Sequence, residues 1–455
     1  MFTIKTNKNC LNEKKYVFDF IFREVLKIQY KVELHEELNV QILFDSKKII
    51  INEFFFEEVK EKWLENINLI PNISNYIDIY KLPLKVNILH GSIPIIFGND
   101  NIEFIDNNEI LIGLDIFGSI FYLLTGYEET QNIRRDIHNR FVCKNSFLTN
   151  DNLILRPIVN EYIEFLFSLI KYFNSGLKLP YRKFEKNITS DVDLPYNHDF
   201  KNVKGLISGS IKYLFKKNYT DSPFKLIKNY FKFKFNKKIN DKEYNNFDWM
   251  LEKLNRKKNK LIFFFLFNKD KHKLDGDYLI DEQPIKNLID KIDKRGHEIG
   301  IHFSYDTYKN YNKMRDELIE FDSVISSREK RSRQHYLRWC SISTPPLLDQ
   351  AGIKNDFTVG FSDHVGFRSG TCFKYRLYDL VSRRILNIFE TPLIVMDVSL
   401  YSEKYMNISS QNQIIDLLEQ LLKECKHYNG TFSAVWHNNQ LNQKDHRLIF
   451  EYLID

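Results

Sequence analysis

The sequence contains few cysteines, and no two of them have the CxxC spacing. The five cysteines are scattered along the chain at Cys10, Cys143, Cys340, Cys372 and Cys425. An odd number without close spacing argues against a disulfide framework and against a cysteine-based zinc site. We therefore expect reduced thiols, as in a cytoplasmic protein.

Export and membrane segments are also missing. The N-terminus, MFTIKTNKNCLNEKKYVF, carries charges where a signal peptide needs an apolar core. The longest apolar run, from Leu111 to Gly126, is short and has Asp115 in its middle. This run predicts a buried helix rather than a membrane span. Together these absences predict a soluble, cytoplasmic protein with no transmembrane segment.

The chain lacks a strong excess of either charge. Lysine and arginine number 66 against 60 aspartates and glutamates, for a formal net charge of +6. Such a mild excess gives no indication of nucleic-acid binding. The common GxGxxG, HExxH and GxSxG motifs and a phosphate-binding loop are absent as well, which removes the most familiar nucleotide, zinc-protease and serine-hydrolase signatures.

Apolar material is plentiful. Of the 455 residues, 43% are hydrophobic and 15% aromatic, which is enough for real cores. The length predicts two or three domains. Residues 1–180 mix helical and strand patterns and predict a smaller α/β companion domain of unknown role. The polar stretch LKLPYRKFEKN marks the predicted boundary.

From residue 181 to residue 455 short apolar strands alternate with amphipathic helices. KLIFFFLFN is typical of a strand buried on both faces, and QPIKNLIDKIDKRG of a helix ending at Gly296. The alternation predicts a mostly parallel sheet, either open or closed into a barrel. A basic, aromatic insert near residues 205–258 offers a surface for a polymer, but an exposed amphipathic element covering the barrel is the favoured interpretation.

Two aspartates stand at the end of the first strand of this second region. Asp191 and Asp193 are two residues apart, so their side chains point to the same side of a strand. Two carboxylates in one pocket repel each other unless a cation lies between them or their roles diverge. A natural division makes Asp193 a metal ligand and Asp191 a general base, whereas an exposed turn before a proline is an equally good interpretation of this stretch alone.

The stretch RGHEIGIHFSYDT holds a second set of candidates. His297 and His302 are five residues apart, which places them on opposite faces of a strand and makes them poor partners for one metal ion. His302 and Asp306, four residues apart, can share a face in a helix or in one turn of loop. A structural role for a single histidine remains the more common outcome.

Three cations and one strand-end histidine complete the candidates. His437 closes a predicted strand, where a general acid could lie, and Arg333, His335 and Arg368 are suited to holding a carboxylate or an anionic substrate. Singly, none of these residues indicates a function.

Their order is more informative. From about Phe184 to the C-terminus, the succession DVDLP, GHEIGIHFSYDT, RQHYLRW, GFRSGTC and VWHN resembles the polysaccharide deacetylase family, the NodB-like carbohydrate esterases. More narrowly, it is similar to a bacterial subgroup with an uncharacterised N-terminal companion domain. The resemblance implies a distorted (β/α) barrel and a divalent metal cofactor, with Zn²⁺ favoured.

The same resemblance implies roles for individual residues. Asp191 matches the general base, Asp193 and His302 match metal ligands, and His437 matches the catalytic acid. Arg333 or Arg368 matches the cation that orients the base. The sequence departs from the family at Asp306, where a second metal histidine is usual, so Asp193, His302 and Asp306 form the expected ligand set. Ser190 also stands where the subgroup tends to have histidine.

The resulting prediction is a metal-dependent carbohydrate N-deacetylase acting on an N-acetylated glycan or glycan precursor of a surface-polysaccharide pathway. The departures at Asp306 and Ser190 leave open a binding or scaffold protein of such a pathway that keeps the barrel and has lost turnover. A deacylase of small amides outside carbohydrate chemistry is the third alternative. The sequence does not indicate which sugar is bound or which oligomer forms.

Overall fold

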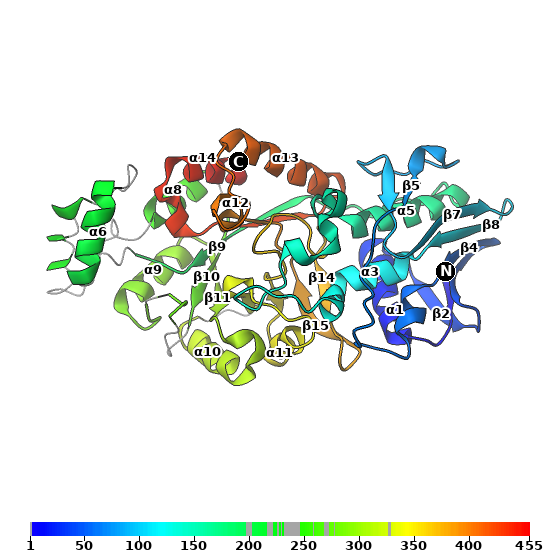
Figure 1. Ribbon diagram of the computed structural model, residues 1–455, viewed down its shortest axis with the longest axis horizontal. Helices are drawn as coiled ribbons and strands as arrows, with labels where there is room; N and C mark the ends of the chain where they lie inside the picture. Colours follow the sequence, from blue (N-terminus) through cyan, green and yellow to red (C-terminus); the bar gives the residue numbers. More distant parts are fainter. Residues whose placement is uncertain are drawn as a thin grey trace.

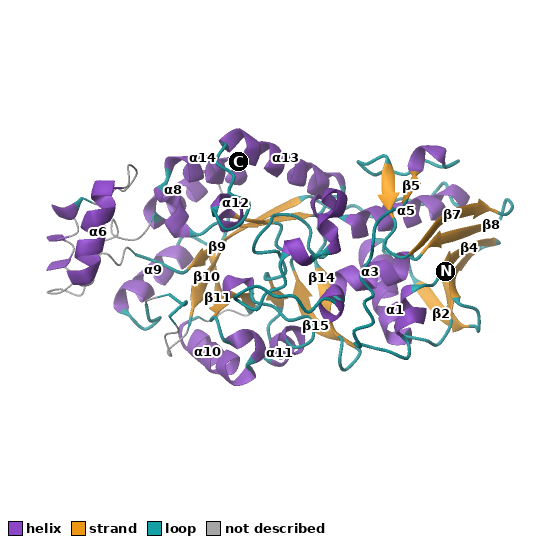
Figure 2. Ribbon diagram, viewed as in Figure 1, coloured by secondary structure: helices purple, strands orange, loops and turns teal. Residues whose placement is uncertain are grey.

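The computed structural model describes most of the chain in two sheets with helices around them (Figures 1 and 2). The described residues are 2–196, 203–215, 222–224, 227–228, 230–231, 246–257, 259–267, 273–276, 278–325 and 329–455. Much of the insert expected near residues 205–258 therefore lies outside the described residues. Its two longest described parts are helices, α6 (Val203–Phe215) and α8 (Phe247–Lys257), and α6 projects from the body at the left of Figure 1.

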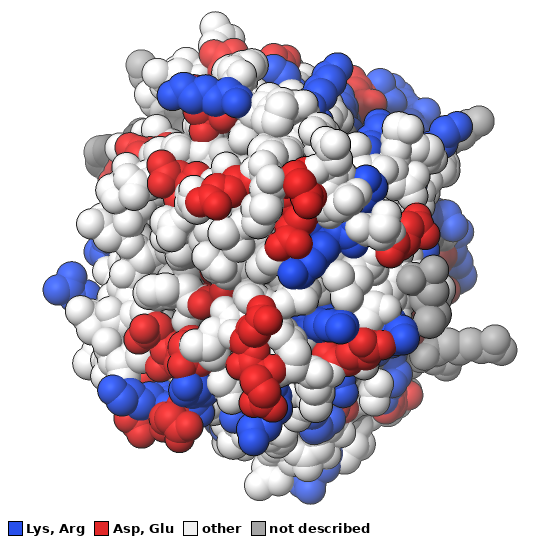
Figure 3. All heavy atoms as spheres, turned by 90° about the vertical axis from the view of Figure 1, so that its right-hand side faces the viewer, with Lys and Arg blue, Asp and Glu red and all other residues white. Residues whose placement is uncertain are grey.

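The first sheet is mixed and uses residues from the start of the chain. It has six strands, in the order β2 (Tyr30–Leu34), β1 (Phe2–Thr6), β3 (Asn39–Phe44), β4 (Lys47–Asn52), β8 (Glu109–Leu114) and β7 (Gly98–Phe104). β1 pairs with β2, and β4 with β8, in parallel, while the other neighbours are antiparallel. The end of the molecule formed by this region shows acidic and basic side chains intermixed (Figure 3). A short separate ladder joins β5 (Tyr76–Asp78) to β6 (Ser92–Pro94).

The apolar run from Leu111 to Gly126 is buried as predicted, but it is not helical throughout. Residues 111–114 belong to β8, and Asp115 ends the strand and caps the following helix, Ile116–Thr125. The Asp115 carboxylate accepts the backbone N–H of Gly118 at 2.8 Å and that of Phe55 at 2.8 Å. Burial raises the pKa of Asp115 to about 6, against the opposing effect of these hydrogen bonds. The helices of this region are α1 (Leu11–Phe18), α2 (Phe55–Val59), α3 (Ile116–Thr125), α4 (Glu128–Gln131) and α5 (Ile158–Phe173).

The second sheet is almost entirely parallel. It has nine strands, in the order β14 (Tyr375–Asp379), β15 (Arg384–Glu390), β13 (Asn355–Asp356), β12 (Arg331–Gln334), β11 (Glu298–Phe303), β10 (Ile262–Leu266), β9 (Glu185–Val192), β17 (Thr431–Val435) and β16 (Val395–Met396). Only β14 and β15 pair antiparallel. All five residues of β10 are buried, which explains its unbroken apolar sequence.

Helices lie around the outside of this sheet (Figure 2). They are α9 (Gln283–Asp293), α10 (Tyr311–Val324), α11 (Thr344–Gln350), α12 (Asp397–Tyr401), α13 (Gln411–His427) and α14 (Lys444–Ile454). The expected α/β class is confirmed. Among the described residues the sheet curls but its hydrogen-bonded order ends at β14 and β16, so a closed barrel is not shown.

The two sheet regions are joined through partly buried polar contacts. Glu13 of α1 is fully buried and accepts two hydrogen bonds from Arg383, at 2.7 and 2.8 Å. Trp63 donates its indole N–H to the carbonyl of Leu380 at 2.8 Å. The chain passes from one region to the other between α5 and β9. No helix within the described residues is long and apolar enough to cross a membrane.

Candidate metal centre

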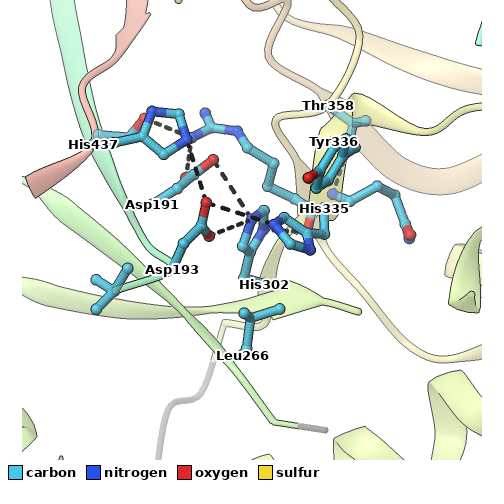
Figure 4. A network of polar contacts seen from close by, with 12 residues as sticks. Asp191, Asp193, Leu266, His302, His335, Tyr336, Thr358 and His437 are labelled. Carbon is cyan, nitrogen blue, oxygen red and sulfur yellow. Dashed lines mark hydrogen bonds and ion pairs between the residues drawn. The ribbon is translucent and has the colours of Figure 1, made fainter. Parts of the chain in front are cut away.

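The site lies at the carboxyl edge of the parallel strands β9, β11 and β12. Register places Leu266 of β10 beside His302, and His302 beside Arg333 of β12. Asp193 follows the end of β9 directly, and His335 follows the end of β12. Because parallel strands all end at the same edge of a sheet, these side chains converge although the sequence separates them widely. Figure 4 shows Asp193, His302 and His335 pointing toward one another.

Asp193, His302 and His335 form a cluster with the spacing of a metal site. One ligand atom from each lies within 4.8 Å of the others. The Nε2 atom of His302 is 3.4 Å from one Asp193 oxygen, and the Nε2 atom of His335 is 3.5 Å from the other. A carboxylate and two imidazoles suit zinc and related divalent ions, and three protein ligands leave further coordination positions open.

Both histidines are oriented by contacts through their other nitrogen. His302 Nδ1 lies 3.0 Å from the backbone carbonyl of Arg333, and His335 Nδ1 lies 2.8 Å from an Asp275 carboxylate oxygen. These oxygens only accept hydrogen bonds, so each Nδ1–H donates and each Nε2 is directed at the centre. His302 Nε2 and Asp193 Oδ1 are buried without a hydrogen-bond partner. The donor set therefore fits a divalent cation, which would satisfy both atoms.

The charges in the cluster reinforce one another. Burial by itself would raise the pKa of Asp193, but His335, His302 and His437 outweigh it and hold that pKa well below its usual range. Burial opposes protonation of His335, yet Asp193 and Asp275 raise its pKa to about 9. Without a metal ion, a proton on His335 therefore balances the buried carboxylates.

Asp191 lies beside the cluster and is held by a buried arginine. Arg333 Nη1 donates to Asp191 Oδ1 at 2.7 Å and to the Thr189 hydroxyl at 2.8 Å. Its Nε donates to the carbonyl of Phe357 at 3.0 Å. The other Asp191 oxygen is 3.7 Å from His302 Nε2. Asp191 is thus an oriented carboxylate at the edge of the metal cluster.

His437 flanks the cluster from the direction of β17. Asp397 accepts hydrogen bonds from the His437 backbone N–H and from its Nδ1, each at 2.7 Å. The Nε2 atom of His437 is 3.7 Å from Asp193. Burial opposes the charge of His437, but Asp397 foremost, with Asp193 and Asp191, raises its pKa to about 10. His437 is therefore a protonated imidazole directed into the site at neutral pH.

A pocket of about 330 Å³ opens over these groups. Its floor contains Asp191, Asp193, His302, His335 and His437. Its walls combine aromatic, apolar and polar side chains, including Tyr336, Tyr405, Met396, Val398, Leu274, Asn439, Gln440 and Arg140. The arrangement combines a candidate cation site, an oriented carboxylate and a protonated imidazole around one cavity.

Comparisons with known proteins cover the two regions unequally. Residues 2–175 match a family of unknown function (DUF7033). The sequence matches no curated protein. A crystal structure from Mycobacterium smegmatis, described as a "putative polysaccharide deacetylase", resembles 61% of this chain and 85% of its own, with 13% identity and a TM-score of 0.38.

Asp306 does not join the cluster, contrary to the expected ligand set. Its carboxylate is 41% exposed and lies 3.3 Å from Lys313 and 3.6 Å from Arg338. β11 ends at Phe303, and the chain turns into a short 3-10 helix from Thr307. The four-residue spacing from His302 therefore does not return to the same face. His335 is the third member of the cluster instead. From the sequence, His335 was predicted only as a cation that holds a carboxylate or an anionic substrate.

Arg368 contacts groups other than Asp191 and Asp193. It pairs with Glu129 at 2.5 Å and donates to the carbonyl of Gly360 at 2.8 Å. Of the two candidate arginines, Arg333 is the one beside Asp191. His297 is buried, and its Nδ1 accepts the backbone N–H of Leu261 at 3.3 Å, as a supporting residue of the sheet would.

Asp397 and Asp275 were not anticipated from the sequence. Asp397 follows β16 directly. Its position at a strand end was the only feature of the sequence that could have marked it as a site residue. Asp275 lies between β10 and α9 without a local motif.

Proposed function

We propose that this protein is a metal-dependent hydrolase that removes an N-acetyl group from a sugar of a glycan or surface-polysaccharide precursor. The observation that carries the proposal is the arrangement of Asp193, His302 and His335 between the Asp191–Arg333 pair and the Asp397–His437 pair. The order of motifs that resembles polysaccharide deacetylases supports the same chemistry. The proposal places the catalytic region at residues 181–455 and a companion domain at residues 1–180.

Asp193, His302 and His335 would hold the divalent ion, with zinc the favoured identity. Bound there, the ion supplies Lewis-acid chemistry, which polarises a carbonyl and makes a water molecule more acidic. The pocket over these three residues has room for a substrate oxygen and a water molecule. The proton transfers of the reaction are carried out by side chains of this protein.

Asp191 acts as the general base. Its carboxylate borders the cluster and accepts the proton of the attacking water, while Arg333 fixes its orientation. His437 acts as the general acid and gives its Nε2 proton to the nitrogen of the departing amine. An unprotonated amine is a poor leaving group, so this transfer is needed for the C–N bond to break. Asp397 keeps His437 protonated and fixes its ring.

The direct experiment measures metal content and acetate release together. Protein stripped by a chelator is titrated with Zn²⁺, Co²⁺ and Mn²⁺ and then incubated with N-acetylhexosamine oligosaccharides. We expect one ion per chain and release of acetate, with loss of binding in Asp193→Ala. Loss of turnover with retained metal is expected in Asp191→Asn.

Other outcomes separate the alternatives. A wild-type protein that binds no divalent ion contradicts the proposal. Metal binding together with oligosaccharide binding, but without acetate release, favours a binding protein of the same pathway. Release of acetate from small N-acetyl amides but from none of the sugars favours the non-carbohydrate deacylase.

A further inference from the structure

A segment of the N-terminal region reaches the pocket. Residues 132–141 leave the end of α4 and approach the turn after β12. Arg140 lines the pocket together with Asp191 and Asp193. The whole segment lies within residues 2–175, which match a family of unknown function. One residue of the pocket lining, Arg140, therefore comes from outside the proposed catalytic region.

Arg140 is almost fully engaged by the protein itself. It is only 4% exposed. Its Nε donates to Asp136 at 2.8 Å, and its Nη2 lies 2.7 Å from the same carboxylate. Its Nη1 donates to the carbonyl of Tyr336 at 3.0 Å, and its Nη2 to the hydroxyl of Tyr405 at 2.9 Å. Because Asp136 balances its charge, Arg140 is better suited to hold the pocket wall than to bind an anionic substrate.

The carbonyl that Arg140 holds belongs to an unusual turn. Tyr336 has φ 60° and ψ 12°, and Leu337 has φ 52°. Two consecutive non-glycine residues in the left-handed region are rare and must be stabilised by their surroundings. The turn follows His335 directly, and Figure 4 shows Tyr336 next to that histidine. Whatever fixes the turn thus also fixes one ligand of the proposed metal site.

The same segment also contacts Arg338, at the other end of the turn. Arg338 Nε donates to the carbonyl of His138 at 3.0 Å. The Arg338 guanidinium lies 3.9 Å and 4.0 Å from the ring centres of Tyr305 and Tyr308. Asn139 donates to the Tyr308 hydroxyl at 2.6 Å. His138 and Arg140 therefore contact both ends of the turn that follows His335: Arg140 contacts Tyr336, and His138 contacts Arg338.

We propose that residues 132–141 are an integral part of the active site, with Arg140 as the positioning residue that fixes the His335–Leu337 turn. The inference rests on the proposed function in so far as His335 is a metal ligand. It assigns a role to the N-terminal region, namely to complete a pocket that the proposed catalytic region does not form alone. In this role Arg140 acts through Tyr336 and does not touch the reacting atoms.

The test compares Arg140→Ala and Arg140→Lys with Arg135→Ala in the full-length protein. Arg135 is on the same segment, but its guanidinium donates to the carbonyls of Asn132, Arg134 and Glu129, which do not line the pocket. The first readout is hydrogen–deuterium exchange of peptides covering residues 335–339 in metal-free protein. We expect faster exchange in Arg140→Ala, a partial return in Arg140→Lys and no change in Arg135→Ala.

The second readout is the visible spectrum and affinity of bound Co²⁺, together with Zn²⁺ competition. Arg140→Ala should change the Co²⁺ absorption bands and weaken Zn²⁺ binding by about 10–100-fold, the usual effect of losing a residue that supports a ligand. Should Arg140→Ala fail to fold, Tyr405→Phe removes a single bond of the clamp and should change exchange and spectrum in the same direction.

The two proposals fail in different ways. Wild-type exchange rates in Arg140→Ala, or an unchanged Co²⁺ spectrum with unchanged Zn²⁺ affinity, overturn the role of Arg140 while leaving the metal site intact. A wild-type protein that takes up no metal overturns the proposed function, and the exchange comparison still decides whether the segment holds the turn.

Discussion

Arg333 and Asp191 form an ion pair of 2.7 Å in which both side chains are buried, at 0% and 3% exposure. They are 142 residues apart in the sequence. Such a pair costs desolvation and is retained where a carboxylate must keep one orientation. The pair lies beside the candidate metal site, so its loss should affect both the stability of the fold and the orientation of Asp191.

Arg333→Ala should therefore affect both folding and turnover. Leaving Asp191 buried without its partner is expected to lower the free energy of unfolding by about 3–5 kcal/mol. Urea denaturation measures this loss. Arg331→Ala is the matched control on the same strand, because its partners Glu298 and Glu329 are half exposed, at 44% and 45%, and such pairs contribute about 1 kcal/mol or less. Equal losses in the two variants would contradict the special role of Arg333.

Asp397→Asn should shift the pH profile of the reaction. His437 must be protonated to act as an acid, and the Asp397 carboxylate is the main cause of its pKa of about 10. Removing that charge lowers the pKa, so the alkaline fall in kcat/KM should move to lower pH. Asp445→Asn, at an exposed position of α14, should leave the profile in place. An alkaline limb that stays unmoved in Asp397→Asn would exclude His437 as the acid.

Removing the observed third ligand, His335, and the expected one, Asp306, in separate variants compares the two ligand sets directly. His335→Ala removes an atom of the cluster and should weaken Zn²⁺ binding by more than the roughly 10–100-fold that a supporting residue contributes. Asp306→Ala should retain wild-type affinity because its carboxylate faces Lys313 and Arg338. Isothermal titration of metal-free protein measures both. Weaker binding in Asp306→Ala alone would restore the original ligand set.

Metal affinity should also depend on pH. The pKa of His335 is about 9 in the metal-free site, so metal binding must displace its proton at any lower pH. Apparent Zn²⁺ affinity should then rise about tenfold per pH unit for this one proton, and level off above pH 9. Asp193 adds no such dependence near neutrality because its pKa is well below the usual range. An affinity that is flat between pH 6 and 8 would contradict the protonated state of His335.

Glu317 should lower the free energy of unfolding as pH rises. Burial, opposed by hydrogen bonds from Ser304, raises its pKa to about 8. Between its ordinary pKa near 4.5 and that value, the folded protein holds a proton that the unfolded chain releases. The free energy of unfolding should decrease by up to about 1.4 kcal/mol per pH unit across this window.

Glu317→Gln should remove this contribution, since the amide keeps an acceptor for the Ser304 N–H and cannot ionise. Thermal unfolding at pH 5, 6, 7 and 8 should show a shallower decline in Glu317→Gln than in the wild type. Asp316→Asn, at an exposed position of the same helix α10, is the control. Parallel declines in all three proteins would refute the raised pKa.

The sequence predicted those parts of the molecule that depend on local periodicity. Apolar runs and amphipathic helices indicated the α/β class, because side chains alternate in strands and repeat every three to four residues in helices. The same rule placed Asp191 and Asp193 on one side of a strand end and separated His297 from His302. Those inferences needed no knowledge of which strands are neighbours.

Tertiary structure decided which distant residues complete each pair. Parallel register set β12 beside β11, so His335 rather than Asp306 reached His302. The crossovers of the sheet brought Arg333, and not Arg368, to Asp191, and brought Asp397 to His437. Packing of the N-terminal segment against the turn after β12 placed Arg140 in the pocket. Spacing along a chain cannot predict these contacts, because strand order and domain packing, rather than sequence distance, determine which strand ends meet.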